Sequence, residues 1–331
     1  MTPRFLFSPR IVAVAAAGLA AGLLAACGGG GGSASDGSMS ASDAQGYAAD
    51  AATMPVSAAT AVESSVGTLE NALAVSAAAG TSEHALSAQT QALTGTVACL
   101  GGGTIAWSVS GSTPALEANG QFDTGEVYAV TFTQCGSPDG DAVLDGSVTL
   151  TVNQRTATSV DLTHTTSALT LTTSVGQWVV NGSTRASRAW TGTSGGGTQV
   201  SSQLSSSGVS LSSTIGSWQA SYALKSIDWT VVRSYDASGQ LSARSHQGTL
   251  AIDASTRRRP NASLQITTNG ALTIGSDGLA AAGSFSVVDA HDTIACTYGN
   301  GTLTLTLDLG NDGTIDRSWT VTRTDFDGSA G

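Results

Sequence analysis

An acidic stretch near the end of the chain has the residue types that bind calcium. Asp308, Asp312 and Asp316 stand at positions 1, 5 and 9 of the spacing found in calcium-binding loops. Carboxylate oxygens are the hard ligands that Ca²⁺ prefers. However, position 3 is Gly310, and position 12 is Trp319 rather than the usual bidentate glutamate. We therefore expect a hairpin turn first and a weak Ca²⁺ site as the alternative.

The only run of basic residues is Arg257, Arg258 and Arg259, which Pro260 follows. Proline restricts the residue before it to extended backbone, so this run fits a loop at the end of a strand. A solvated loop is the first expectation. Contact with an anion, such as a phosphate or an acidic saccharide, is the alternative.

One short motif has the letters of a hydrolase nucleophile. Residues 192–196 match the pattern G-x-S-x-G, with Ser194 at the position of the nucleophile. That motif needs a strand before it and a helix after it. Because the β-like residues 198–200 follow, we expect a turn, and a hydrolase ranks last among the functions considered.

The histidines have weak catalytic surroundings in the sequence. His291 stands between Asp289 and Asp292, but alternation along a strand points its ring away from both. We expect a surface histidine. A cleft in which His291 or His246 meets carboxylates would favour an enzyme.

Two-residue periodicity governs residues 96–326 and defines the elements that carry these groups. Leu303, Leu305 and Leu307 alternate with threonines, as do apolar residues in several other segments. This is the pattern of a half-buried strand. Tryptophans also fall on the expected strands, where core packing is the first expectation and ligand contact the alternative; they are Trp178, Trp190, Trp218, Trp229 and Trp319.

Asn-Gly and Asp-Gly pairs recur through the same region and favour tight hairpin turns. With the spacing of the apolar segments they predict on the order of 14–17 antiparallel strands. The expected fold is mainly β, a large antiparallel meander that is either a curved sheet (a half-barrel) or a sandwich. The pairs are Asn119-Gly120, Asp139-Gly140, Asp145-Gly146, Asn181-Gly182, Asn269-Gly270, Asp277-Gly278, Asn300-Gly301 and Asp312-Gly313.

The N-terminus has the features of an export signal. Arg4 and Arg10 precede an apolar stretch that is short for a bilayer span of about 20 residues. It ends in Leu-Ala-Ala before Cys27, which resembles the lipobox of bacterial lipoproteins. The resemblance implies cleavage of residues 1–26 and acylation of Cys27, which anchors the chain in a lipid bilayer. Gly28 in place of an aspartate suggests the outer membrane, with the exposed side left open.

Two segments separate this anchor from the β region. Residues 27–43 form a flexible Gly/Ser tether with a reach of roughly 20 Å. Residues 44–93 are rich in alanine and predict one or two short helices that lie against the following domain. Residues 327–331 are a short tail.

A second resemblance concerns residues 97–152. Its motifs are Val97-Ala98-Cys99-Leu100-Gly101-Gly102-Gly103-Thr104 and Val130-Thr131-Phe132-Thr133-Gln134-Cys135. They resemble a segment of a proteobacterial lipoprotein family to which no activity is assigned, so the likeness implies architecture and location only. Both cysteines belong to the shared segment and each flanks an expected strand, which favours a Cys99–Cys135 disulfide in an oxidising compartment. Cys296 is then a buried thiol, or less readily a reactive one.

Composition narrows the function classes. The net charge is −11 and becomes −13 if residues 1–26 are removed, since these contain Arg4 and Arg10 and no acid. Such a charge disfavours nucleic-acid binding. We expect a non-catalytic structural or interaction module of the cell envelope that uses no cofactor, with a carrier of an apolar, lipid-like ligand as the alternative.

Lipidation of Cys27 gives the first testable prediction. Metabolic labelling with a fatty-acid probe should mark the wild-type protein and should not mark Cys27→Ala, because the thioether needs the cysteine sulfur. Equal labelling of the two proteins would disprove the anchor.

Overall fold

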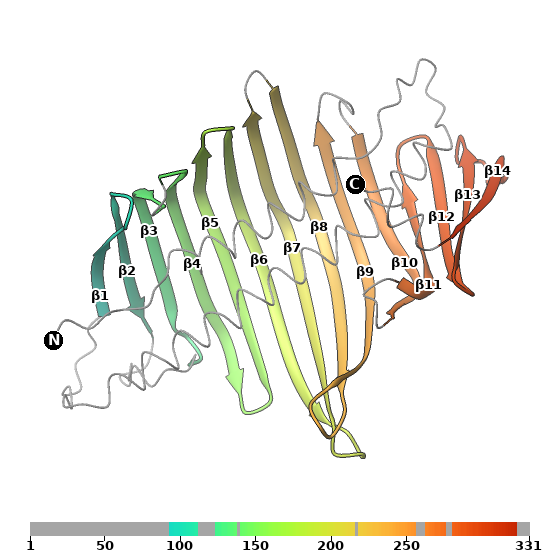
Figure 1. Cartoon of the computed structure of the whole chain (residues 1–331), viewed down its shortest axis with the longest axis horizontal. Helices are drawn as coiled ribbons and strands as arrows, with labels where there is room; N and C mark the ends of the chain where they lie inside the picture. Colours follow the sequence, from blue (N-terminus) through green and yellow to red (C-terminus); the bar gives the residue numbers. More distant parts are fainter. Residues whose placement is uncertain are drawn as a thin grey trace.

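The computed structural model describes residues 93–111, 123–137, 140–215, 218–255, 262–275 and 280–322. Fourteen strands in these residues form one antiparallel sheet in which each strand pairs with its neighbours in sequence (Figure 1). They are β1 (Leu93–Ala98), β2 (Thr104–Ser110), β3 (Val127–Gly136), β4 (Ala142–Thr156), β5 (Ser159–Thr173), β6 (Gln177–Gly192), β7 (Thr198–Ile215), β8 (Trp218–Tyr235), β9 (Leu241–Ser255), β10 (Ala262–Ile274), β11 (Ala280–Val288), β12 (Asp292–Gly299), β13 (Thr302–Leu309) and β14 (Arg317–Thr322).

The predicted antiparallel meander is confirmed, and of its two forms the single sheet is the one found, not the sandwich. The strand region begins at Leu93, which opens β1, so the expected boundary at residue 96 is three residues late. The signal, the tether and the rest of the alanine-rich segment 44–93 lie outside the described residues. Within the described part, no helix is long and apolar enough to cross a membrane.

The sheet has two chemically different faces. Leu303, Leu305 and Leu307 of β13 are fully buried, and across the strand pair Leu305 faces Cys296, which in turn faces Phe285. We call this side the apolar face. Thr304 and the other alternate residues lie on the opposite side, which we call the hydroxyl face. One core cluster runs along the apolar face from β6 to β13, and a second gathers residues of β2 to β5 with Cys99.

Three of the predicted hairpin turns are wrong, because their Asx-Gly pairs lie inside strands. Asp145-Gly146 is in β4, Asn181-Gly182 is in β6 and Asn269-Gly270 is in β10, and the pairing register shifts at each place. These pairs lie at β-bulges instead, and the glycines of the first two have positive φ, 103° at Gly146 and 132° at Gly182. Asn300-Gly301 does form the expected turn, between β12 and β13, with φ of 52° and 76°.

Two of the bulges share one construction. The bulged residues Gln134 and Ala168 both have φ of 47°. The backbone N–H of Ala168 donates to Asn181 Oδ1 at 2.6 Å, and that of Gln134 donates to Asp145 Oδ1 at 2.7 Å. The next residue is glycine because a Cβ on Gly146 would lie 2.2 Å from the carbonyl oxygen of Ala168. The Asx side chain therefore satisfies the bulge of the preceding strand, and the glycine after it leaves room for the backbone of the following strand.

Because two of these Asx-Gly pairs form no turn, β4 and β6 continue through them. Strands β4 to β9 each contain 15 to 18 residues. The turns of hairpins β4–β5, β6–β7 and β8–β9 lie along the same edge of the sheet, at the bottom of Figure 1. This edge carries the site described below.

Asn181 offers a direct test of the bulge construction. Asn181→Ala should destabilise the protein by about 1–2 kcal/mol, because the N–H of Ala168 loses its acceptor. Asn181→Asp keeps an acceptor oxygen and should cost clearly less. Chemical denaturation of both variants measures the difference, and equal losses would contradict the role of the hydrogen bond.

Candidate functional site

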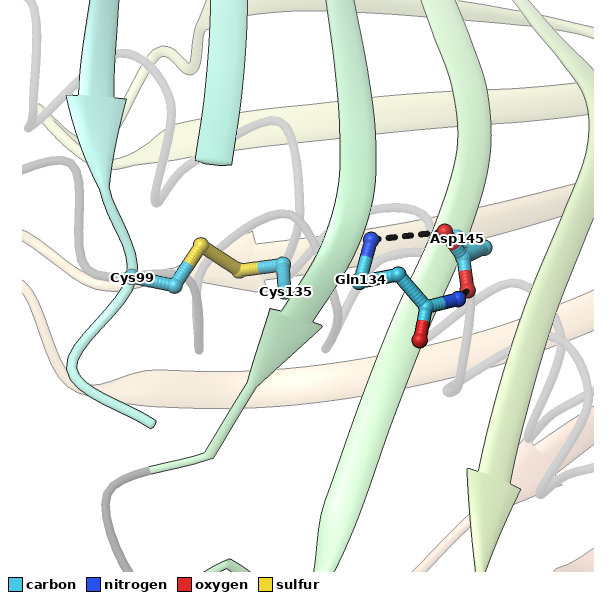
Figure 2. The surroundings of a disulfide bond; sticks show 4 residues. All are labelled: Cys99, Gln134, Cys135 and Asp145. Carbon is cyan, nitrogen blue, oxygen red and sulfur yellow. Dashed lines mark hydrogen bonds between the residues drawn. A yellow bond between two sulfur atoms is a disulfide. The ribbon is translucent and has the colours of Figure 1, made fainter. Parts of the chain in front are cut away.

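The disulfide predicted from the cysteine-flanked strands is present. Cys99 follows β1 and Cys135 lies near the end of β3, and their sulfur atoms are bonded at 2.04 Å (Figure 2). Figure 2 also shows Gln134 and Asp145, whose contact clamps the neighbouring bulge. A crosslink across 36 residues contributes about 4 kcal/mol in the chain-entropy model. This corner is structural, since it holds β1 and β2 to β3.

Cys296 is the buried apolar thiol that the sequence favoured. Its exposed fraction is 0%, and burial raises the pKa of its thiol far above the usual range. A thiol without thiolate character is a poor nucleophile, so Cys296 packs in the core between Phe285 and Leu305.

The acidic stretch at 308–316 uses its carboxylates within the loop between β13 and β14. Asp308 accepts the backbone N–H groups of Asp312 and Gly313, at 3.1 and 2.9 Å. Asp316 accepts the N–H of Leu309 at 2.7 Å. In the described residues, no three His, Cys, Asp or Glu side chains gather as a metal-binding group. The turn expectation is supported by these contacts, while Ca²⁺ binding stays a prediction.

The remaining sequence candidates fall at separate places. Ser194 lies in the exposed turn between β6 and β7, with a strand on each side rather than the helix that a nucleophile elbow needs. His291 is exposed, and its backbone N–H donates to Asp289 Oδ1 at 2.8 Å. Arg257, Arg258 and Arg259 lie outside the described residues, so their anion contact stays a prediction.

The long central strands bring together basic side chains that the sequence analysis missed. Residues paired across antiparallel strands share a face. One row across β4 to β10 on the apolar face consists of Arg155, Val160, Arg188, Ser202, Val231, His246 and Leu272. The next row contains Trp190, Val200, Arg233, Arg244 and Ile274. We call Arg155, Arg188, Arg233, Arg244 and His246 the cationic end of the apolar face.

Trp190 organises the β4–β6 side of the cationic end. The guanidinium carbons of Arg155 and Arg188 lie 5.5 and 5.3 Å from the centre of the indole ring. Such cation–π contacts hold each guanidinium in place and contribute roughly 0.5–1 kcal/mol at exposed sites. Arg188, Arg155 and Trp190 are all half-buried, so this part of the site borders solvent.

The β8–β9 side of the site is buried around His246. The exposed fraction of His246 is 1%. Burial first, then the positive charges of Arg244 and Arg233, lower the pKa of its imidazole to about 3. His246 is therefore neutral at pH 7, with one N–H donor and one acceptor nitrogen. Its neighbours are arginines, not the carboxylates that an acid–base pair would need.

Several polar atoms in this region are buried without a hydrogen-bond partner. They are Nε of Arg188, Oγ of Ser202, Nε1 of Trp229 and both ring nitrogens of His246. Each such atom costs about 1–3 kcal/mol relative to a bonded one. Buried polar groups in proteins are nearly always paired, so this concentration marks the cationic end as unusual.

The signal for this site was present in the sequence as a break in alternation. Arg188 occupies an apolar-face position between Ala186 and Trp190, and His246 occupies one between Arg244 and Gly248. Recognising the pattern requires the cross-strand register, because only the register places the arginines of separate hairpins on one edge.

Comparison with known proteins adds no assignment. No protein-family model matches this chain, and no curated protein is significantly similar to it.

The depressed pKa of His246 predicts a pH dependence of stability. The unfolded chain binds a proton near pH 6.5 and the folded chain only near pH 3, so stability is complete above pH 6.5 and falls as the pH drops toward 3. Arg188 lies in the same row of the sheet as His246, and Arg233 and Arg244 lie in the next row. Each of these positive charges opposes protonation of His246.

His246→Leu removes this titration while filling similar space. Between pH 7 and 4.5 the wild type should lose about 1–3 kcal/mol more than the variant, measured by urea denaturation at each pH. Identical pH profiles would show that His246 is not held neutral.

Proposed function

We propose that this chain is a lipoprotein of the bacterial cell envelope, anchored in the outer membrane through acylated Cys27. In this proposal the β sheet is a non-catalytic structural or interaction module that the tether holds close to the bilayer. The support for the anchor is the cysteine-containing cleavage motif after a short apolar stretch.

The observation that carries the interaction role is the uninterrupted hydroxyl face. It extends across one sheet of fourteen strands and carries mainly serine and threonine, as in β5, β7 and β13. Two ion pairs lie on this face: Arg185 contacts Asp161, and Lys225 lies 2.6 Å from Asp253. Asp145 and Asp228, also on this face, accept hydrogen bonds from Gln134 and Gln203. A broad surface of hydroxyl groups supplies many hydrogen bonds and needs no pocket.

A second candidate function is the binding or transport of a lipid-like ligand on the apolar face. The observation that favours it is the cationic end, where half-buried Arg188 and Trp190 stand next to buried apolar residues. Sites for small ligands combine apolar walls with a few polar groups in this way.

Photo-crosslinking from the hydroxyl face tests the first candidate. A photoreactive amino acid at Thr165 or Ser210, both exposed on that face, should form an adduct of the same mass with one envelope component. The matched position is Ser194 in the exposed β6–β7 turn, which should form none. Adducts from all three positions, or from none, would contradict an interface on the hydroxyl face.

A further inference from the structure

The cationic end concentrates positive charge in an acidic protein. The described residues contain seven lysines and arginines, and four of them belong to this one edge of the apolar face. Of the others, Arg185 and Lys225 lie on the hydroxyl face. Arg155 and Arg188 are two strands apart, about 10 Å between backbones, and the guanidinium groups of both contact the ring of Trp190.

The carboxylates of the same strands face the other way. Asp145, Asp161, Asp228 and Asp253 are the acids within β4 to β9, and each adjoins a buried residue of the apolar face, which places it on the hydroxyl face. Asp236, in the β8–β9 turn at this edge, accepts the N–H groups of Ser238 and Gln240. Glu126 accepts a hydrogen bond of 2.5 Å from the hydroxyl of Tyr128.

Several buried donors in this region lack a hydrogen-bond acceptor. Arg188 and Ser202 lie directly opposite each other on adjacent strands. Nε of Arg188 and Oγ of Ser202 are both buried, and neither has a hydrogen-bond partner. His246 stands two strands beyond Ser202 in the same row, with both ring nitrogens unpartnered and an exposed fraction of 1%. These groups cost free energy as they stand, and an anion that accepts from Arg188 Nε–H, the Ser202 hydroxyl and the single N–H of His246 reduces that cost.

We propose that the cationic end is a binding site for an anionic group, a phosphate or a carboxylate. The guanidinium of Arg188, which Trp190 holds in place, presents two N–H donors that match two oxygens of the anion. The hydroxyl of Ser202 and one N–H of His246 donate as neutral groups, and Arg233 and Arg244 add positive field. This inference rests on the second proposed function, ligand binding on the apolar face, and it names the chemistry of the ligand's polar group.

The test uses the complete mature chain, residues 27–331, with Cys27→Ser so that it is not acylated. Calorimetric titration compares three probes: inorganic phosphate, dodecyl phosphate below its micelle-forming concentration, and uncharged dodecyl maltoside under the same conditions. We expect dodecyl phosphate to bind. Equal affinity for inorganic phosphate identifies a free anion as the ligand, and a much weaker affinity identifies an anionic lipid.

Variants assign the binding to this site. Arg188→Gln should weaken dodecyl phosphate at least tenfold, and Arg188→Lys should weaken it less, since lysine keeps the charge without the fork. The matched control is Arg185→Gln, on the same strand but on the hydroxyl face, which should change affinity less than twofold. His246→Leu should weaken binding while leaving the protein folded at pH 7.

Two results would overturn the anion site alone. One is anion binding with equal affinity in Arg188→Gln and Arg185→Gln. The other is equal binding of dodecyl maltoside and dodecyl phosphate, which would leave a lipid-binding function intact but remove the anion site. Failure of all three probes to bind would overturn both the anion site and the second proposed function.

Discussion

The alternation of side chains along a strand is the constraint on which the rest of this structure depends. In one sheet, each residue is assigned to one face, and a shift of one residue would exchange the faces. The fourteen strands keep the apolar rows aligned over long distances, as from Ile266 through Val287 and Ile294 to Leu307. At two places where a strand carries an extra residue, Gln134 and Ala168, a bulge absorbs it, and an Asx side chain on the next strand accepts the unpaired N–H.

The same constraint gives the cationic end its character. A polar residue at an apolar-face position cannot turn to the other side without disrupting its whole strand, so Arg188 and His246 remain where their register puts them. Desolvation then keeps His246 neutral, and Trp190 orients two guanidinium groups. Most polar side chains lie on the hydroxyl face, where they need little desolvation. The polar groups of the cationic end are desolvated at a cost in folding free energy, so they are the best candidate for a function.

Local patterns predicted the fold well because the relevant physics is local. Two-residue periodicity identified the strands around Leu305 and Val148, and the cysteines flanking short strands were paired correctly. The Asx-Gly pairs were ambiguous because they occur at bulges as well as at hairpin turns, so β4 and β6 run through positions where turns were expected. The cationic end was invisible for a different reason: Arg155, Arg188 and Arg244 come from three hairpins, and their meeting depends on register, which one sequence does not display.

The strictly sequential pairing of the strands has a consequence for how the chain folds. No described strand pairs with one distant in sequence, so the contact order is low for an all-β protein of this size. Each new hairpin can add to the edge of the sheet already formed, with only a short loop to close. A chain that emerges N-terminus first can therefore build the sheet from β1 onward, and the Cys99–Cys135 bond can lock the first three strands before the C-terminal half has appeared.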